Sequence, residues 1–133
     1  MINGRIVDTS VWIDFLSKKE SSHVTLFKEM IFENCVMLLP VIMQEVLQGI
    51  REDILFNSIK SVMQDYELLE GNQLELTLGA AGLYRFLRGK GITIQKPNDC
   101  LIAYTCLHHD VPLLHNDKDF TNIAKHTSLK IYK

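Results

Sequence analysis

The stretch RIVDTSVWIDFL, residues 5–16, joins a strand to a helix through one acidic residue. Residues 5–8 are rich in β-branched side chains, which predicts a first strand that ends at Asp8. Thr9 and Ser10 are residue types that favour helix N-caps, and apolar side chains then recur at helical spacing. The stretch therefore predicts a strand that leads directly into a helix, with a carboxylate at the junction.

The same alternation continues along the chain. Short apolar runs predict further strands at residues 35–39, 66–69, 112–115 and 129–132. Helices are expected at residues 23–32, 40–49, 53–63, 72–88, 97–110 and 120–125. Gly79 and Gly82 weaken the fourth of these helices, since glycine destabilises a helix interior. Apolar strands that alternate with helices predict an α/β fold with a parallel sheet covered on both faces.

Length and composition indicate one globular domain. The 133 residues are 47% hydrophobic and 23% charged, and the net charge is -2. The chain is therefore not a polycation, and nucleic-acid binding would need a local basic patch. Three cysteines without a C-x-x-C pair indicate reduced thiols, as in a cytoplasmic protein. We expect no signal peptide and no membrane span, because no apolar run approaches roughly 20 residues.

Four acidic residues are expected to meet at one edge of the sheet. Asp8 and Asp117 follow predicted strands, Asp99 opens a helix, and Glu45 lies in the helix after the second strand. In parallel α/β folds, ligands bind outside the carboxyl ends of the strands. Clustered carboxylates bind hard cations such as Mg²⁺, and these cations drive phosphodiester hydrolysis.

Each acid also has an ordinary structural explanation. Asp8 and Asp99 can stabilise helix N-termini, and Asp117 can be a turn residue after Asn116. Glu45 can be an exposed residue on the polar side of its helix. These explanations each account for one residue, but they do not predict that all four share one end of the sheet.

Four segments resemble the PIN-domain nucleases, and in particular the VapC-type toxins of bacterial toxin–antitoxin modules. They are VDTSVWIDFL (7–16), QEVLQG (44–49), NDCLIA (98–103) and LLHNDKDF (113–120). The resemblance covers nearly the whole chain, as one PIN domain over residues 1–133, with the segments in the family's order. The second segment is the least specific, because any amphipathic helix could supply it.

The resemblance implies a three-layer α/β/α fold with a five-stranded parallel sheet. It also implies a Mg²⁺- or Mn²⁺-dependent endoribonuclease that cleaves tRNA or mRNA, forms a homodimer and is neutralised by a VapB-type antitoxin. By position, the catalytic acids would be Asp8, Glu45, Asp99 and Asp117. The metal ligands would be Asp8, Asp99 and Asp117, and the supporting residues would be Thr9, Ser10 and Asp119. Apolar faces within residues 24–32 and 54–63 would form the antitoxin groove.

The chain departs from the family at His115, two residues before the fourth acid, where Ser or Thr is frequent. A hydroxyl there usually orders a metal-bound water, so His115 puts the cleavage rate and the metal preference in question. It could act as a hydrogen-bond donor, contact phosphate, or have no role.

Basic residues gather between Glu75 and Asp99, where no other acid occurs. They are candidate RNA phosphate contacts: Arg85, Arg88, Lys90 and Lys96. A solvated helix end, where the helix dipole favours basic residues, is the alternative explanation.

Other Mg²⁺-binding α/β classes fit less well. Receiver domains carry paired acids after the first strand and a lysine after the last, whereas Thr9 and Ser10 follow Asp8 and that lysine is not evident. Haloacid-dehalogenase-type phosphatases need Asp-x-Asp, and the position two after Asp8 is Ser10. A catalytically weak PIN fold that binds RNA or protein remains an alternative.

Overall fold

The computed structural model describes residues 3–133, which form a parallel sheet flanked by helices. The strands are β1 (Arg5–Val7), β2 (Val36–Leu38), β3 (Glu67–Leu68) and β4 (Leu113–Leu114). The helices are α1 (Thr9–Leu16), α2 (Ser22–Phe32), α3 (Pro40–Gln48), α4 (Asp53–Gln64), α5 (Gln73–Gly89), α6 (Pro97–His109) and α7 (Lys118–His126). All the predicted helices are present, with their ends shifted by a residue or two.

The strand order is β3-β2-β1-β4, with every neighbouring pair parallel. Ile6 of β1 lies opposite Met37 of β2 on one side and opposite Leu113 of β4 on the other. β1 and β2 are short because the residue after each one is already a helix N-cap. Asp8 is the N-cap of α1, and Leu39 is the N-cap of α3.

The expected fifth strand is reduced to a single bridge. Leu113 and Ile131 pair in parallel, with the Leu113 N–H donating to Lys130 O and the Tyr132 N–H donating to Leu113 O, both at 2.9 Å. The expectation of five strands is therefore corrected to four strands in residues 3–133, plus this bridge. Pairing ends there because β4 has only two residues before the chain turns towards α7.

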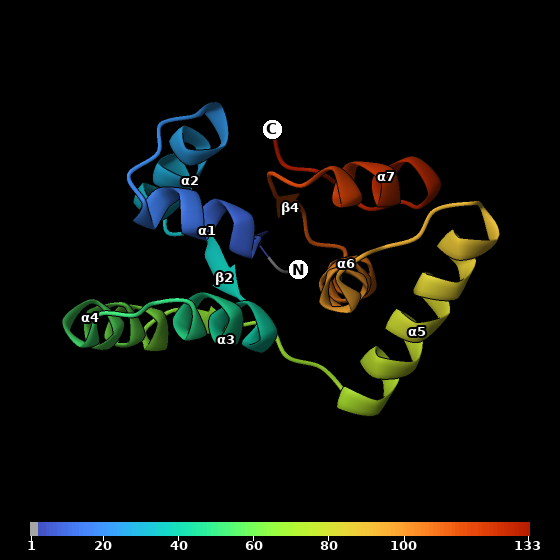
Figure 1. The fold of residues 1–133 in the computed structure, drawn as a ribbon, viewed down its shortest axis with the longest axis horizontal. Helices are drawn as coiled ribbons and strands as arrows, with labels where there is room; N and C mark the ends of the chain where they lie inside the picture. Colours follow the sequence, from blue (N-terminus) through green and yellow to red (C-terminus); the bar gives the residue numbers. More distant parts are fainter. Residues whose placement is uncertain (1–2) are drawn as a thin grey trace.

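The helices form two layers around the sheet. Figure 1 shows α1 to α4 in the left half of the molecule and α5 to α7 in the right half, with α5 packed on the outside of α6. This arrangement is the three-layer α/β/α sandwich that the resemblance implies. Right-handed crossovers explain it, because β1 to β3 progress in one direction across the sheet and β4 reverses it.

Aromatic contacts join α1 to α2 within the first helical layer. Trp12 is 2% exposed, and its ring meets Phe27 edge-on at a centroid distance of 4.7 Å. Phe15 packs against the same Phe27 ring at 5.1 Å. Edge-to-face pairs of this kind add about 0.5–1.5 kcal/mol to the burial of the rings. They hold α1, and with it Asp8, against the rest of the first layer.

Gly79 has a packing role inside α5. A Cβ at this position would lie 2.0 Å from the ring of Tyr104 on α6, so only glycine allows the two helices to approach so closely. Gly82 has open space around it and shows no such constraint. Gly79, one of the two glycines that weaken the sequence-based prediction of α5, is therefore a residue that lets α5 pack on α6.

Candidate active site

Asp8 links β1 to α1 and lies beside the end of β4. Its N–H donates to Leu114 O at 2.9 Å, so the carboxyl ends of the two adjacent strands meet at this residue. Its Oδ2 accepts the Ser10 N–H at 3.1 Å and the Ser10 hydroxyl at 2.6 Å. Asp8 is therefore the N-cap of α1, and the expectation that Thr9 or Ser10 would cap it is wrong. Both are helical residues, because Asp8 keeps an extended backbone and its carboxylate reaches the free N–H group.

Asp117 has the corresponding position after β4, at the N-cap of α7. Its Oδ1 accepts the N–H of Asp119 at 2.9 Å, and its Oδ2 lies 3.2 Å from the ammonium group of Lys96. Asp119 itself lies in the first turn of α7, where the helix dipole favours an acid. The start of α7 therefore presents two carboxylates to the same edge of the sheet as Asp8.

Asp99 completes the cluster of carboxylates and comes from α6. Pro97 starts α6, which places Asp99 in its first turn. One carboxylate oxygen from each of Asp99, Asp117 and Asp119 lies within 4.8 Å of the others. Asp99 is 4% exposed, and its buried Oδ2 has no hydrogen-bond partner. A buried carboxylate oxygen without a partner is unfavourable, and a cation would satisfy it.

The pKa values reflect this crowding. Burial, followed by repulsion from Asp8, raises the pKa of Asp99 to about 7, although Lys96 opposes the shift. Burial also raises the pKa of Asp8, against the hydrogen bonds from Ser10. Burial acts in the same direction on Asp117, but the Asp119 N–H and the Lys96 ammonium outweigh it and lower its pKa. The pKa values of Asp8 and Asp99 are thus both raised, and a cation bound beside them would lower both.

Glu45 approaches this site from α3 without joining the three-carboxylate cluster. Its Oε1 accepts the Thr9 hydroxyl at 2.6 Å, and its Oε2 accepts the Asn98 side-chain amide at 3.3 Å. Thr9 follows Asp8, and Asn98 precedes Asp99. Glu45 is therefore held by the immediate neighbours of two site acids, one from α1 and one from α6.

A hydrogen-bond network that the sequence analysis missed ties the loop before Asp117 to α1. The Asn116 N–H donates to the Ser10 hydroxyl, and the Asn116 side-chain amide donates to Asp14 Oδ2, each at 3.1 Å. His23 Nε2 lies 3.0 Å from the same Asp14 oxygen, and this contact lowers the pKa of Asp14. We call Asp14, Asn116 and His23 the loop clamp. Ser10 connects the clamp to Asp8.

His115 accepts a hydrogen bond that a hydroxyl residue at this position could also accept. Its Nδ1 accepts the N–H of Asp117 at 3.1 Å, which is a bond that a Ser or Thr side chain can also accept from two residues further on. The ring packs near Phe120, with centroids 5.4 Å apart, and burial lowers the pKa of His115. Lower basicity preserves this bond, because Nδ1 accepts only when it is unprotonated.

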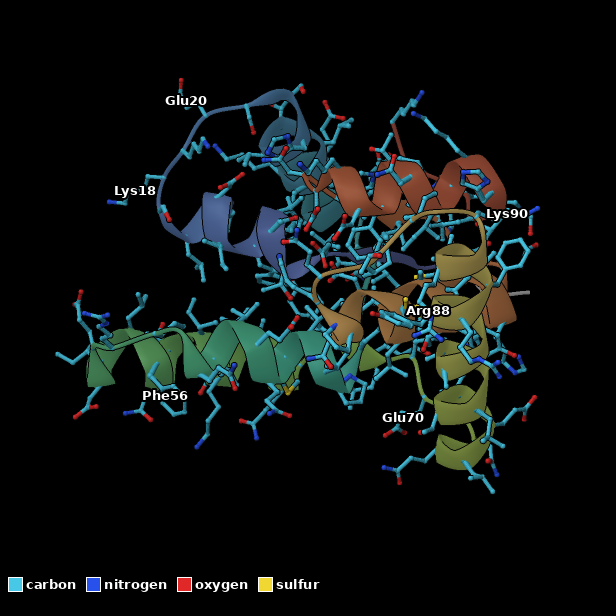
Figure 2. All side chains as sticks on the ribbon, turned by 45° about the vertical axis from the view of Figure 1, so that its right-hand side comes forward. Lys18, Glu20, Phe56, Glu70, Arg88 and Lys90 are labelled. Atoms are coloured by element: carbon cyan, nitrogen blue, oxygen red, sulfur yellow. The ribbon has the colours of Figure 1, made fainter. Side chains whose placement is uncertain are left out.

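Of the four candidate phosphate contacts, Lys96 is the one that pairs with the acids within residues 3–133. Arg88 lies over the ring of Tyr84 at 5.7 Å, and Lys90 lies over Phe86 at 5.6 Å. Figure 2 shows Arg88 near the C-terminal end of α5 and Lys90 just beyond it. Arg85 is exposed on the same helix. The role of Arg85, Arg88 and Lys90 in RNA binding stays a prediction.

Comparison with known proteins gives a family match and a consistent set of relatives. The profile of the PIN domain family matches residues 5–126. VapC ribonuclease Mb1587 of Mycobacterium bovis and ribonuclease VapC11 of Mycobacterium tuberculosis are each 28% identical over 127 residues, covering 94% of this chain and 95% of theirs.

Solved structures show the same fold. The VapBC2 structure from Rickettsia felis, bound to a DNA fragment from its promoter, superposes with a TM-score of 0.73 at 17% identity, covering 96% of both chains. VapBC-1 of nontypeable Haemophilus influenzae superposes with a TM-score of 0.71 at 19% identity, covering 97% of this chain and 96% of that one.

Proposed function

Because this chain belongs to the PIN domain family, we propose that it is a single-domain, metal-dependent endoribonuclease toxin that a VapB-type antitoxin neutralises. The observation that carries the proposal is the buried, unpartnered Oδ2 of Asp99 beside the carboxylates of Asp117 and Asp119. Names of the curated relatives, which are VapC ribonucleases, support the reaction class.

The donor set fits Mg²⁺ or Mn²⁺. These ions prefer oxygen ligands and are held by a few carboxylates while other positions stay open for water and phosphate. Asp99, Asp117 and Asp119 would hold the ion, with Asp8 adding negative charge beside Asp99. Such an ion supplies charge stabilisation at the phosphate and lowers the pKa of a bound water.

The side chains would divide the remaining work between positioning and proton transfer. Asp8, Glu45, Asp99 and Asp117 are the proposed catalytic acids. Thr9 and Asn98 orient the carboxylate of Glu45, which can accept a proton at one of its oxygens from an attacking water. Ser10 orients Asp8, and no Ser or Cys nucleophile is required.

Exposed lysine and arginine side chains around the site would contact the RNA. The side chain of Lys96 is 66% exposed next to the acids, and Arg85, Arg88 and Lys90 extend the positive charge along α5. Contacts of this kind bind phosphate whatever the base sequence. They are consistent with either tRNA or mRNA as the substrate.

The antitoxin would bind the apolar face of α4. Ile54, Leu55 and Val62 are 86%, 36% and 47% exposed. The apolar face of α2 cannot contribute equally, because Val24, Phe27 and Met30 are buried in the core. The VapBC complexes among the structural neighbours support a partner of this kind.

A second copy of the chain would cover α5. Leu74 and Leu78, one helical turn apart on α5, are 67% and 63% exposed. An exposed leucine pair at this spacing is typical of a helix that packs against another helix. Leu78→Glu should therefore shift the solution mass from dimer to monomer in light scattering.

Cleavage of RNA tests the proposed function directly. The purified protein, freed of any partner, is incubated with total tRNA and with mRNA in Mg²⁺ or Mn²⁺, with and without a chelator. We expect discrete fragments that disappear when the chelator is added. RNA binding without metal-dependent turnover would instead identify a binding module. His115 argues against that alternative, because it keeps the hydrogen bond to Asp117 that a hydroxyl would accept.

A further inference from the structure

The acid site contains a positive charge of its own. Lys96 is the N-cap of α6, fixed there by Pro97, and its side chain reaches across to the N-cap of α7. Its ammonium group lies 3.2 Å from Asp117 Oδ2 and donates a hydrogen bond to it. Lys96 therefore connects the helix that carries Asp99 to the helix that carries Asp117.

The charge of Lys96 acts on Asp99 and Asp8 as well as on Asp117. The hydrogen bond to Asp117 raises the pKa of Lys96 against a smaller opposing effect of burial, and the charges of Asp117, Asp99 and Asp8 add to the rise. In turn, Lys96 lowers the pKa values of Asp99 and Asp117. A single ammonium group thus partly neutralises three carboxylates from three elements of the fold.

This cation is poorly anchored. The Lys96 side chain is 66% exposed, and a four-carbon chain allows its ammonium group to move into solvent at little energetic expense. Asp117, in contrast, is 17% exposed and fixed at a helix N-cap. When a second cation approaches Asp117, Lys96 is therefore the partner that can leave.

We propose that Lys96 is a tethered counter-ion that a divalent cation must displace from Asp117. This proposal rests on the metal site of the proposed function. Two cations cannot share the Oδ2 atom of Asp117 without repelling each other. Displacement also releases the ammonium group beside the place where an RNA phosphate would bind. Metal binding and phosphate binding are then coupled through one side chain.

Binding of Mn²⁺ without RNA tests this proposal. The Mn²⁺ dissociation constant is measured by calorimetry at low ionic strength for the wild type and for Lys96→Met, Lys96→Arg and Lys118→Met. Lys118→Met is the matched control, because it removes the same charge one residue from Asp117, and Lys118 forms no ion pair within the described residues. Metal-induced shifts in the melting temperature provide a second readout.

We expect Lys96→Met to bind Mn²⁺ roughly three- to fivefold more tightly, the upper part of the range expected for release from one exposed ion pair. Its metal-free form should melt at a lower temperature than the wild type, and its shift with Mn²⁺ should be larger. Lys96→Arg and Lys118→Met should stay within about twofold of the wild type.

Unchanged or weaker Mn²⁺ binding by Lys96→Met would overturn the proposal while leaving the metal site intact. Equal tightening by Lys118→Met would also overturn it, because net charge and not the contact with Asp117 would then be the cause. If the wild type itself binds no Mn²⁺, both this proposal and the proposed function fail. Tighter binding by Lys96→Met supports the counter-ion even if no RNA substrate is found.

Discussion

The Thr9 hydroxyl donates a hydrogen bond of 2.6 Å to Oε1 of Glu45. This bond joins the first turn of α1 to α3, across 36 positions of the sequence. Because Asp8 caps the same turn of α1, the bond fixes Glu45 relative to Asp8. The position of Glu45 thus depends on Thr9, which is not one of the proposed catalytic acids.

Thr9→Val removes this bond while keeping the shape of the side chain. We expect the cleavage rate at saturating metal to fall by roughly ten- to a hundredfold, because Glu45 is no longer held in place. The stability should fall by only about 1 kcal/mol. Thr9→Ser keeps the hydroxyl and should retain most of the activity. Equal activity in Thr9→Val and the wild type, measured by single-turnover cleavage, would show that Glu45 does not need this bond.

Asp99 should make the stability of the metal-free protein depend on pH. Its pKa is about 7 in the folded protein and 3.8 ordinarily, so the folded state prefers the protonated form. The stabilisation is complete below pH 3.8 and is lost as the pH rises through about 7. Asp99→Asn cannot ionise and should keep its stability over this range.

Thermal unfolding between pH 5 and pH 8 measures this difference. We expect the melting temperature of Asp99→Asn to exceed that of the metal-free wild type by an amount that grows with pH. Added Mg²⁺ should raise the melting temperature of the wild type most at the high-pH end, because proton and metal compete for Asp99. Parallel curves for the two proteins would contradict a raised pKa at this residue.

Asn116 should control the metal concentration that the enzyme needs. Asn116→Ala removes the bond to Asp14 and loosens the loop that leads into Asp117. We expect half-maximal cleavage at a higher Mn²⁺ concentration and a loss of stability of about 1 kcal/mol. Asn57→Ala, at an exposed asparagine of α4, is the matched control and should leave both quantities unchanged. An unchanged Mn²⁺ concentration for half-maximal cleavage in Asn116→Ala would show that the loop clamp does not affect metal binding.

His115 offers a comparison between two replacements. His115→Thr keeps an acceptor for the Asp117 N–H, whereas His115→Phe keeps a ring against Phe120 but has no acceptor. We expect cleavage within about threefold of the wild type for His115→Thr and a loss of roughly tenfold or more for His115→Phe. The opposite ranking would mean that the packing of the ring on Phe120, and not the hydrogen bond, positions Asp117.

The order of the elements could be predicted from periodicity, because apolar strands and amphipathic helices alternate from residue 5 onward. Asp8 and Asp117 could be placed at one edge of the sheet for the same reason, since parallel strands share their carboxyl ends. The fifth strand could not be judged, because residues 129–132 have strand composition but only one residue of β4 to pair with.

Contacts between residues that are far apart in the sequence could not be predicted from the sequence alone. Asn116 bonds to Asp14 across 102 positions, and nothing in the spacing of either residue indicates the other. Asp119 joins the cluster with Asp99 and Asp117 because α7 starts at Lys118, with Asp117 as its N-cap, and the sequence placed this helix start two residues late. The packing reason for Gly79 likewise required Tyr104 on the neighbouring helix.

Asp99→Asn provides the most direct test of the central claim, that these carboxylates form a metal-dependent ribonuclease site. Wild type, Asp8→Asn and Asp99→Asn are compared in RNA cleavage with Mn²⁺, after circular dichroism has shown that each is folded. We expect both variants to lose cleavage while their secondary structure is unchanged. Full cleavage by both folded variants would contradict the account and place the reaction elsewhere in the molecule.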